Sequence, residues 1–307
     1  MSFLTGGIRD VSKELVEGVP DPGAERDPLT ESRGGLIGRC ANPGCRSGWL
    51  QLFRKRTRPV FEGGWNCSPE CTEARVQLAL RREVDGVTQD QSTHRHRIPL
   101  GLLMLEKGFI SGEQLRRAVD AQRKEGKLRI GEWLAKQGAT DEASVARALS
   151  VQWSCPVLSA RGFSASAMAG VMPRILVERF GALPIRIAGN SLLYLGFEES
   201  VDWAFALSLR KMTGLRVECG IVPSSEFKDA SKRMLKQKFP TVQVTEAVSN
   251  SAAARALAKA IERVQPVSSR LVRVHQLLWL RMFSKPENAG MPDRCAATDV
   301  LCRIGGF

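Results

Sequence analysis

Histidine and aromatic residues are scarce in this chain of 307 residues. It contains three histidines, aromatic residues make up 6% of it, and Tyr194 is the single tyrosine. None of the histidines (His94, His96 and His275) lies in a recognisable setting with a serine or cysteine nucleophile. This scarcity excludes the common nucleophilic hydrolase arrangements, and we expect the protein to be non-enzymatic.

Long apolar runs are also missing from the sequence. The longest candidates, residues 98–105 and 277–280, fall far short of the roughly 18 residues that a membrane-spanning helix needs. Residues 1–19 contain acidic side chains and no apolar stretch of the signal-peptide type. The sequence therefore predicts a cytoplasmic protein without a membrane span. In a reducing compartment its eight cysteines are expected to be metal ligands or buried thiols and not disulfides.

Acidic residues are outnumbered by basic ones. The chain has 45 Lys and Arg against 32 Asp and Glu, which gives a formal charge of +13. A balance of this size favours anionic partners such as nucleic acids, nucleotides or a membrane surface. The same balance is also compatible with a soluble protein that simply has a basic surface.

Composition and periodicity divide the chain into segments of an α+β protein. The predicted segments are a flexible N-terminus (1–38), a cysteine-rich finger (39–82), a linker (83–97), a main domain (98–236), a second linker (237–250), a helix plus β-hairpin module (251–283) and an aperiodic tail (284–307). Within the main domain, a tandem helix-turn-helix repeat (98–155) precedes a small α/β subdomain (156–236). In that subdomain we expect strands at 182–187, 191–197 and 215–222, and helices at 164–180, 202–213 and 225–236.

Four cysteines form two short-spaced pairs near the N-terminus. Cys40 and Cys45 are followed, after a basic stretch, by Cys67 and Cys71. Thiolates in such pairs can converge on one tetrahedral ion, and four cysteines leave no open coordination position. The sequence therefore predicts a structural Zn²⁺ site. The other interpretation is that these are four buried or incidental thiols.

The residues around these pairs favour a finger-like local fold. Residues 43–44 (Pro-Gly) suit a tight turn between the first two ligands. Ser68 and Pro69 suit the cap and first residue of a helix, with Cys71 in its first turn. A knuckle, a β-hairpin and a ligand pair at a helix start resemble a treble-clef zinc finger.

Basic side chains lie between the two cysteine pairs. Arg54, Lys55, Arg56 and Arg58 are close in sequence to the aromatic residues Trp49, Phe53, Phe61 and Trp65. Basic residues interleaved with aromatic ones can contact phosphates and stack on bases. They can equally form a solvated strand edge above a small aromatic core. Binding of nucleic acid through this stretch is one hypothesis for the protein.

The clearest pattern is an internal repeat in the predicted helical region. The first unit has the anchor residues Leu100, Gly101, Gly108, Leu115 and Gln122, and the second has Ile130, Gly131, Gly138, Val145 and Gln152. The glycine, glycine, apolar and glutamine anchors are spaced by 7 residues in each unit, and the units are offset by 30. Such register indicates a duplicated structural unit.

Local chemistry predicts how each unit folds. Gly108 and Gly138 suit the residue after a helix, where a positive φ is needed. Ser111 should cap the second helix with Gln114 in the capping-box position. Thr140 is expected to cap the last helix, and Trp133 should face inward with Leu134. The two units should pack into a cluster of four helices.

The repeat resembles the N-terminal domain of type II secretion and type IV pilus assembly ATPases, including the MshEN-like subtype that binds cyclic di-GMP. That family's repeat runs Arg-Leu-Gly, then a glycine, a leucine and a glutamine at the same spacing. Further similarity follows at residues 155–158 (Cys-Pro-Val-Leu), 173–184 and 213–217. The resemblance covers residues 97–235, which is under half of the chain.

The resemblance implies a nucleotide site on the repeat, in which Arg129, Gly101, Gly131 and Gln152 touch the ligand. The implied residues are Arg97, Leu100, Gly101, Gly108, Leu115, Gln122, Arg129, Ile130, Gly131, Gly138, Val145 and Gln152. The second unit keeps the family's arginine as Arg129, whereas the first has Pro99 there and its nearest arginine is Arg97.

No phosphate-binding loop of the Gly-x4-Gly-Lys-Ser/Thr form occurs in the sequence. We therefore expect a regulatory adaptor without ATPase activity, possessing Zn²⁺ and binding cyclic di-GMP. The alternatives are a scaffold that binds secretion or pilus proteins and a regulator that binds nucleic acid through the basic finger.

Overall fold

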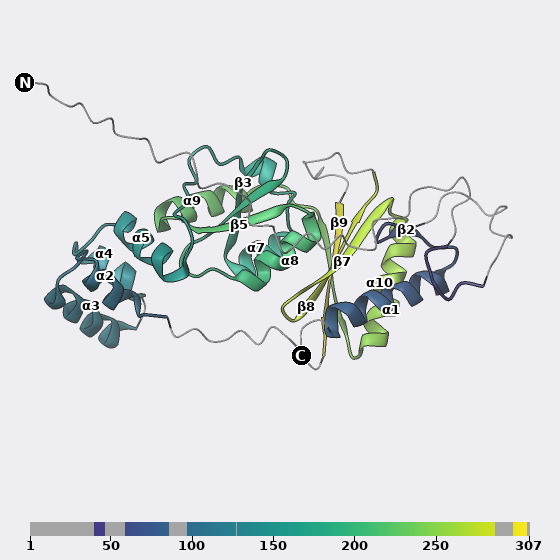
Figure 1. Cartoon of the computed structure of the whole chain (residues 1–307), viewed down its shortest axis with the longest axis horizontal. Coiled ribbons are helices and arrows are strands. Elements are labelled where there is room, and N and C mark those ends of the chain that lie inside the picture. The colour runs from purple at the N-terminus through teal and green to yellow at the C-terminus, as the bar shows by residue number, and fades with distance from the viewer. Residues whose placement is uncertain (1–39, 47–58, 86–96, 127, 286–296, 306–307) are drawn as a thin grey trace, which may run out of the picture. The chain divides into compact units, whose positions relative to one another are not determined.

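The structure of the chain is a computed structural model (Figure 1), which describes residues 40–46, 59–85, 97–126, 128–285 and 297–305. All of these residues belong to one compact unit, Gly34–Phe307. Within the described ranges, no helix has the length and apolar character that a membrane crossing requires. The predicted flexible N-terminus, residues 1–38, lies outside the described residues.

The cysteine-rich segment forms a short hairpin and a long helix. Strands β1 (Val60–Phe61) and β2 (Gly64–Trp65) are antiparallel, and α1 (Pro69–Asp85) follows them. Ser68 Oγ accepts a hydrogen bond from Cys71 N at 3.3 Å, which confirms the predicted helix start. The predicted end of the finger at residue 82 is too early, because α1 continues to Asp85, and residues 86–96 of the predicted linker lie outside the described residues.

The repeat forms the four predicted helices. They are α2 (Leu100–Glu106), α3 (Gly112–Glu125), α4 (Ile130–Lys136) and α5 (Glu142–Trp153). The capping box of Ser111 and Gln114 is present, and Gly108 and Gly138 have φ values of 68° and 66°. The predicted cap Thr140 is wrong. Asp141 caps α5 instead, because its carboxylate reaches Ser144 N at 2.7 Å and carries the charge that a helix N-terminus favours.

The α/β part contains a three-stranded sheet with the order β3-β4-β5. Its elements are α6 (Ala165–Met168), α7 (Arg174–Phe180), β3 (Ala182–Ala188), β4 (Leu192–Phe197), α8 (Trp203–Thr213), β5 (Arg216–Ile221) and α9 (Ser224–Leu235). Strand β4 is antiparallel to β3 and parallel to β5. The single helix expected at 164–180 is two helices, because Pro173 disfavours a helical conformation of the residue before it.

The C-terminal region forms a four-stranded sheet with the order β6-β9-β8-β7. Its elements are β6 (Thr241–Ala247), α10 (Asn250–Val264), β7 (Ser268–Val274), β8 (Leu277–Phe283) and β9 (Ala297–Ile304). The predicted linker at 237–250 is wrong, since it contains β6, and so is the predicted aperiodic tail at 284–307, since it contains β9. Strand β9 is buried at most positions, so its sequence has no simple alternation of apolar and polar residues.

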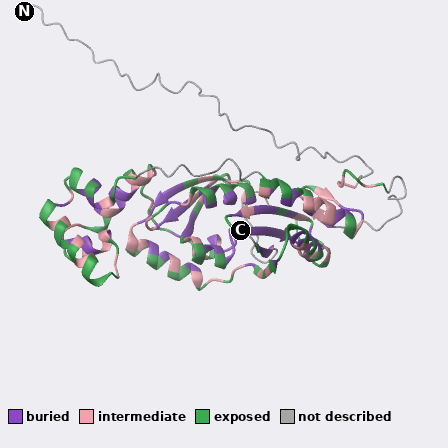
Figure 2. Ribbon diagram, turned by 90° about the horizontal axis from the view of Figure 1, so that it is seen from below, coloured by how far each residue is buried: buried purple, intermediate pink, exposed green. Residues whose placement is uncertain are grey.

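The two faces of this sheet are covered by different parts of the chain. Residues such as Leu271 and Leu280 share a core with α10 and with Val76 and Leu80 of α1. Val272, Val274, Leu277, Trp279 and Leu301 belong instead to the core of the α/β part. Figure 1 shows α1 beside α10, and Figure 2 shows buried positions along the strands. Segments from both ends of the sequence therefore complete one core, with residues 98–236 between them in the chain.

A buried ion pair lies on the second face of the sheet. Arg281 of β8 and Asp299 of β9 are 1% and 0% exposed. Arg281 donates to both carboxylate oxygens of Asp299 at 2.9 and 3.0 Å, and Trp279 Nε1 donates to the same carboxylate at 2.7 Å. Arg281 Nη1 also donates to the carbonyl of Val171 in the α/β part at 2.6 Å. Both charges are thus compensated by direct hydrogen bonds.

The turn between β7 and β8 packs against the α/β part. His275 Nε2 lies 2.7 Å from Asp202 Oδ2, and its ring stacks on Phe180 with the ring centroids 5.1 Å apart. Ser208 Oγ of α8 donates to the carbonyl of Arg273 at 2.7 Å. Asp202 also caps α8 by accepting from Phe205 N at 2.9 Å. The hairpin expected around His275 is therefore anchored by its turn.

We predict that Asp299→Asn lowers the free energy of unfolding by about 3 kcal/mol, because it leaves a buried guanidinium without its counter-charge. Urea denaturation measures the loss. Asp229→Asn, at an exposed position of α9, is the matched control and should change stability little. Equal stability of the two variants would contradict a structural role for the buried pair.

We predict that the contact of His275 loses stabilising free energy as the pH rises. The hydrogen bond to Asp202 raises the pKa of His275, while burial, Arg179 and Arg273 oppose this shift. Folding that raises a histidine pKa stabilises the protein fully below the unfolded pKa, and the contribution disappears as the pH passes the folded pKa.

His275→Asn tests this expectation, because asparagine tolerates the positive φ of 51° at that position. The loss in free energy of unfolding should be larger at pH 6 than at pH 8, by less than about 1 kcal/mol since the pair is partly exposed. Urea titrations at both pH values measure it. Identical losses would show that the charge of His275 plays no part.

Candidate functional site

The glycines at the helix starts of the repeat permit close packing of helices. A Cβ atom on Gly101 would lie 2.6 Å from Leu115 Cδ1, and one on Gly131 would lie 2.9 Å from Val145 Cγ1. The partner lies 14 positions after the glycine in both units, so the anchors of the repeat are also its packing contacts. Approach of a ligand to these glycines remains a prediction.

The two glutamines of the repeat connect the units to each other. Gln122 Nε2 donates to the carbonyl of Leu128 at 3.2 Å, and Gln152 Nε2 donates to the carbonyl of Ile98 at 2.7 Å. Leu128 and Ile98 are equivalent positions, 30 residues apart, just before α4 and α2. Each unit therefore fixes the chain that enters the first helix of the other.

A cavity of about 600 Å³ lies between the second unit and the α/β part. It is bordered by α4 and α5, by the residues after β4, and by the start of α9. Six of the predicted ligand residues line it: Leu100, Arg129, Ile130, Gly131, Val145 and Gln152. The other six are not among its lining residues: Arg97, Gly101, Gly108, Leu115, Gln122 and Gly138. The structure thus brings together mainly the residues of the second unit.

The first unit differs at its helix start. Pro99 caps α2 without a side-chain hydrogen bond, at the position that Arg129 occupies before α4. Arg97 does not substitute for the missing arginine in the cavity lining. Its guanidinium carbon lies 3.4 Å from the ring centroid of Trp153, which itself lines the cavity.

Charged residues from both sides of the cavity form ion pairs. Arg129 contacts the carboxylate of Glu199, which follows β4. Lys228 Nζ of α9 lies 3.2 Å from Glu132 and 3.3 Å from Glu198. The backbone N–H of Arg129 and the ammonium of Lys228 lower the pKa of Glu132. Burial opposes the charged form of Lys228, but hydrogen bonds to Glu132 and Glu198 raise its pKa.

The glutamates of this site and Lys228 were not predicted from the sequence. Glu132 had a detectable signal, because it lies at the third position of α4, and its carboxylate accepts from Arg129 N at 3.2 Å. Glu198, Glu199 and Lys228 lie some 70 to 100 positions from Arg129 in the chain. Only the packing of the α/β part on the repeat makes them neighbours.

The four predicted metal ligands converge in space. The Sγ atoms of Cys40, Cys45, Cys67 and Cys71 all lie within 4.8 Å of one another. Separations are 3.4 Å between Cys45 and Cys67, and 3.6 Å between Cys67 and Cys71. Tetrahedral Zn²⁺ with Zn–S bonds of about 2.3 Å requires sulfur separations of roughly 3.8 Å. The cluster therefore fits one such ion.

Backbone and amide groups support the thiols. Cys67 N points to Cys40 Sγ at 3.4 Å, and Asn42 Nδ2 points to Cys71 Sγ at 3.3 Å. Cys45 N donates to the carbonyl of Asn42 at 3.0 Å, which closes the predicted turn over residues 43–44. Donors of this kind stabilise thiolates that share a metal ion.

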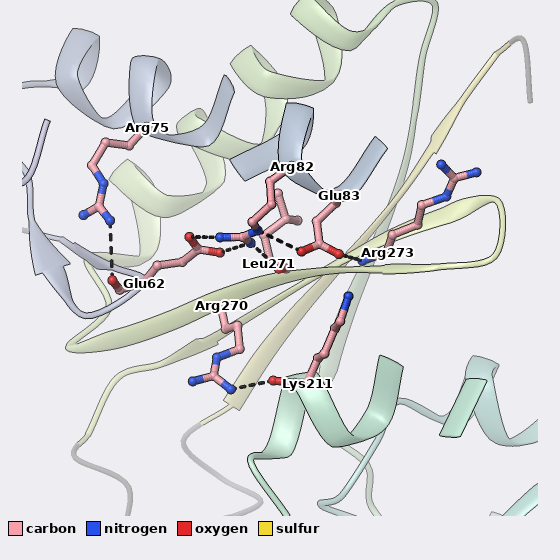
Figure 3. A network of polar contacts seen from close by, with 8 residues as sticks. All are labelled: Glu62, Arg75, Arg82, Glu83, Lys211, Arg270, Leu271 and Arg273. Carbon is pink, nitrogen blue, oxygen red and sulfur yellow. Dashed lines mark hydrogen bonds and ion pairs between the residues drawn. The ribbon is translucent and has the colours of Figure 1, made fainter. Parts of the chain in front are cut away.

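A network of charged residues joins this finger to the C-terminal sheet (Figure 3). Arg82 of α1 donates to both carboxylate oxygens of Glu62 at 2.9 and 2.7 Å and to Glu83 at 3.1 Å. Glu83 in turn accepts from the backbone N–H of Arg273 in β7 at 3.1 Å. Backbone hydrogen bonds from Val60 N to Pro266 O and from Glu62 N to Ser269 O place β1 along β7. The finger is thus part of the sheet's edge.

Some sequence predictions lie outside the described residues. These are the basic stretch with Arg54, Lys55, Arg56 and Arg58, the aromatic residues Trp49 and Phe53, and the histidines His94 and His96. Binding of nucleic acid through the basic stretch accordingly stays a prediction.

Comparison with known proteins finds one whose sequence is similar to part of this chain. No family model matches the chain. The type IV pilus assembly ATPase PilB of Myxococcus xanthus (strain DK1622) is 29% identical over 145 residues, which is 47% of this chain and 25% of PilB. The chain thus spans about a quarter of the length of this curated relative.

Solved structures give weaker likenesses. A structure of MshE with cdg has 27% sequence identity and a TM-score of 0.36, covering 45% of this chain and 99% of that one. The N-terminal domain of XpsE has 20% identity and a TM-score of 0.33, covering 44% and 92%. The predicted resemblance is confirmed in its coarser form: an α+β protein, part of which is similar in sequence to a pilus assembly ATPase.

Proposed function

We propose that the protein is a non-enzymatic regulatory adaptor of a secretion or pilus system that binds cyclic di-GMP in the cavity beside α4 and α5. The observation that carries the proposal is the cavity of about 600 Å³ lined by Arg129, Gly131 and Gln152 of the second repeat unit. The size suits a small ligand, and the repeat resembles that of the cyclic di-GMP-binding subtype.

The chemistry of the cavity supports a nucleotide ligand. The guanidinium of Arg129 can pair with a phosphate or with a guanine edge. Leu100, Val145 and Leu149 supply an apolar wall, and Trp153 supplies an aromatic face for a base. A ligand here would touch the repeat and the α/β part at once, as a regulatory ligand must if it is to change their contact.

We propose further that Cys40, Cys45, Cys67 and Cys71 hold one structural Zn²⁺. Four cysteine ligands close the coordination sphere, so the ion would support the fold of the finger and perform no catalysis. Loss of the ion should destabilise the C-terminal sheet, because Glu62 and Glu83 connect the finger to β7.

Isothermal titration calorimetry with cyclic di-GMP tests the nucleotide proposal. We expect saturable binding that Arg129→Ala weakens by about tenfold or more, since a charge-assisted contact is lost. Arg123→Ala, in the last turn of α3 and outside the cavity lining, is the matched control and should bind as the wild type does.

Absence of binding at high micromolar ligand would overturn this function. It would leave the scaffold alternative, which an exposed apolar stripe supports. Leu102 and Leu105 of α2 are 52% and 38% exposed, and Ile98, which precedes the helix, is 57% exposed.

Metal analysis tests the zinc proposal. The purified protein should contain one equivalent of zinc, and Cys45→Ser should lower both the zinc content and the resistance of the C-terminal sheet to urea. Cys155→Ser is the matched control, because Cys155 is outside the cluster. A zinc-free protein with unchanged stability after chelation would refute the site.

A further inference from the structure

Among the described residues, three polar bridges cross the junction between the helical repeat and the α/β part. Arg129 contacts Glu199, Glu132 contacts Lys228, and Glu142 Oε2 accepts from the backbone N–H of Ser225 at 3.0 Å. The repeat supplies one member of each bridge from α4 or α5 or from the residue just before α4. All six residues except Ser225 line the cavity. The walls of the cavity are therefore held together largely by the groups that a ligand would contact.

Carboxylates pair with Arg129 and Lys228, two of the cations that line this cavity. The lining contains the acids Glu132, Glu142, Glu198 and Glu199 and the bases Arg129, Lys136 and Lys228. Arg129 and Lys228 both contact carboxylates, and Ser224 Oγ also donates to Glu198. An anionic ligand would therefore meet two cations that are already paired with carboxylates, and acids that repel it.

We propose that Glu199 acts as a carboxylate latch across the junction, which competes with the phosphates of an anionic ligand for Arg129, while Glu198, within the α/β part, competes with them for Lys228. When the ligand displaces the carboxylate of Glu199, the junction between the repeat and the α/β part loosens. Binding in the cavity thereby changes the contact between these two parts. This inference rests on the proposed function, because it names how the same site is regulated.

The latch is weak enough for a ligand to displace. The side chain of Arg129 is 71% exposed and that of Lys228 is 57% exposed. Ion pairs with this exposure change an equilibrium constant by only about twofold to fivefold each. A phosphate that accepts two hydrogen bonds from a guanidinium forms a stronger pair than an exposed carboxylate does. Competition between the carboxylates and the phosphates thus lowers the affinity for the ligand without preventing its binding.

Calorimetry with cyclic di-GMP on the full chain measures the competition. Glu199→Gln removes the competing charge and keeps the side-chain shape, so it should tighten binding by about twofold to fivefold. Glu198→Gln should act in the same direction through Lys228. Glu125→Gln, at an exposed position of α3 outside the cavity lining, makes the same change in net charge and should leave the affinity unaltered.

Hydrogen exchange without ligand measures the latch independently of binding. The N–H of Ser225 lies in the first turn of α9, where a helix supplies no acceptor, and its bond to Glu142 crosses the junction. In Glu199→Gln, exchange at Ser225 and in peptides covering residues 128–136 should be several-fold faster than in the wild type. Glu125→Gln should exchange at the wild-type rate.

The outcomes separate the latch from the proposed function. Tighter binding by Glu199→Gln, or binding by that variant alone, supports the latch. Equal affinities of the variant and the wild type overturn the latch and leave the nucleotide function standing. If neither protein binds, the proposed function fails, and the exchange rates decide the latch: faster exchange supports its hold on the junction, and unchanged exchange overturns it.

Discussion

The buried pair of Arg281 and Asp299 is the interaction on which the arrangement of the described chain depends. A guanidinium and a carboxylate that are almost wholly removed from water are tolerable only when each finds the other in good geometry. Arg281 therefore requires β9 beside β8, and its Nη1 donates to the carbonyl of Val171. One side chain thus connects the end of the chain, the C-terminal sheet and the α/β part.

The duplicated helical unit is symmetric in its packing and asymmetric in its surroundings. In both units a glycine allows an apolar side chain to approach its helix, and a glutamine fixes the entry into the other unit. Only the second unit borders the cavity with an arginine at its helix start, whereas the first has Pro99 and exposes Leu102. The repeat has thus kept one fold while its two faces meet different neighbours, which favours one ligand site and one free surface.

Features governed by a few consecutive residues could be predicted from the sequence. The capping box at Ser111, the positive φ of Gly108 and the convergence of Cys67 and Cys71 near a helix start each depend on groups within one or two turns of chain. The misplaced cap at Thr140 was an error of one residue, because two neighbouring side chains could each cap the same helix. Gln152 was likewise recognisable, because it repeats Gln122 at the same spacing, and Arg129 was recognisable through the resemblance of the second unit to the ATPase family's repeat.

The sequence by itself determined the repeat, the cysteine cluster and most helix boundaries, since local hydrogen bonding and backbone preferences decide these. Only the tertiary structure decided that residues 297–304 are a strand between β6 and β8 and that the finger borders β7. It alone placed Glu198, Glu199 and Lys228 around Arg129. The physical reason is that groups far apart in the chain stabilise a buried strand and form the cavity between the repeat and the α/β part, and no local pattern records which distant groups will meet.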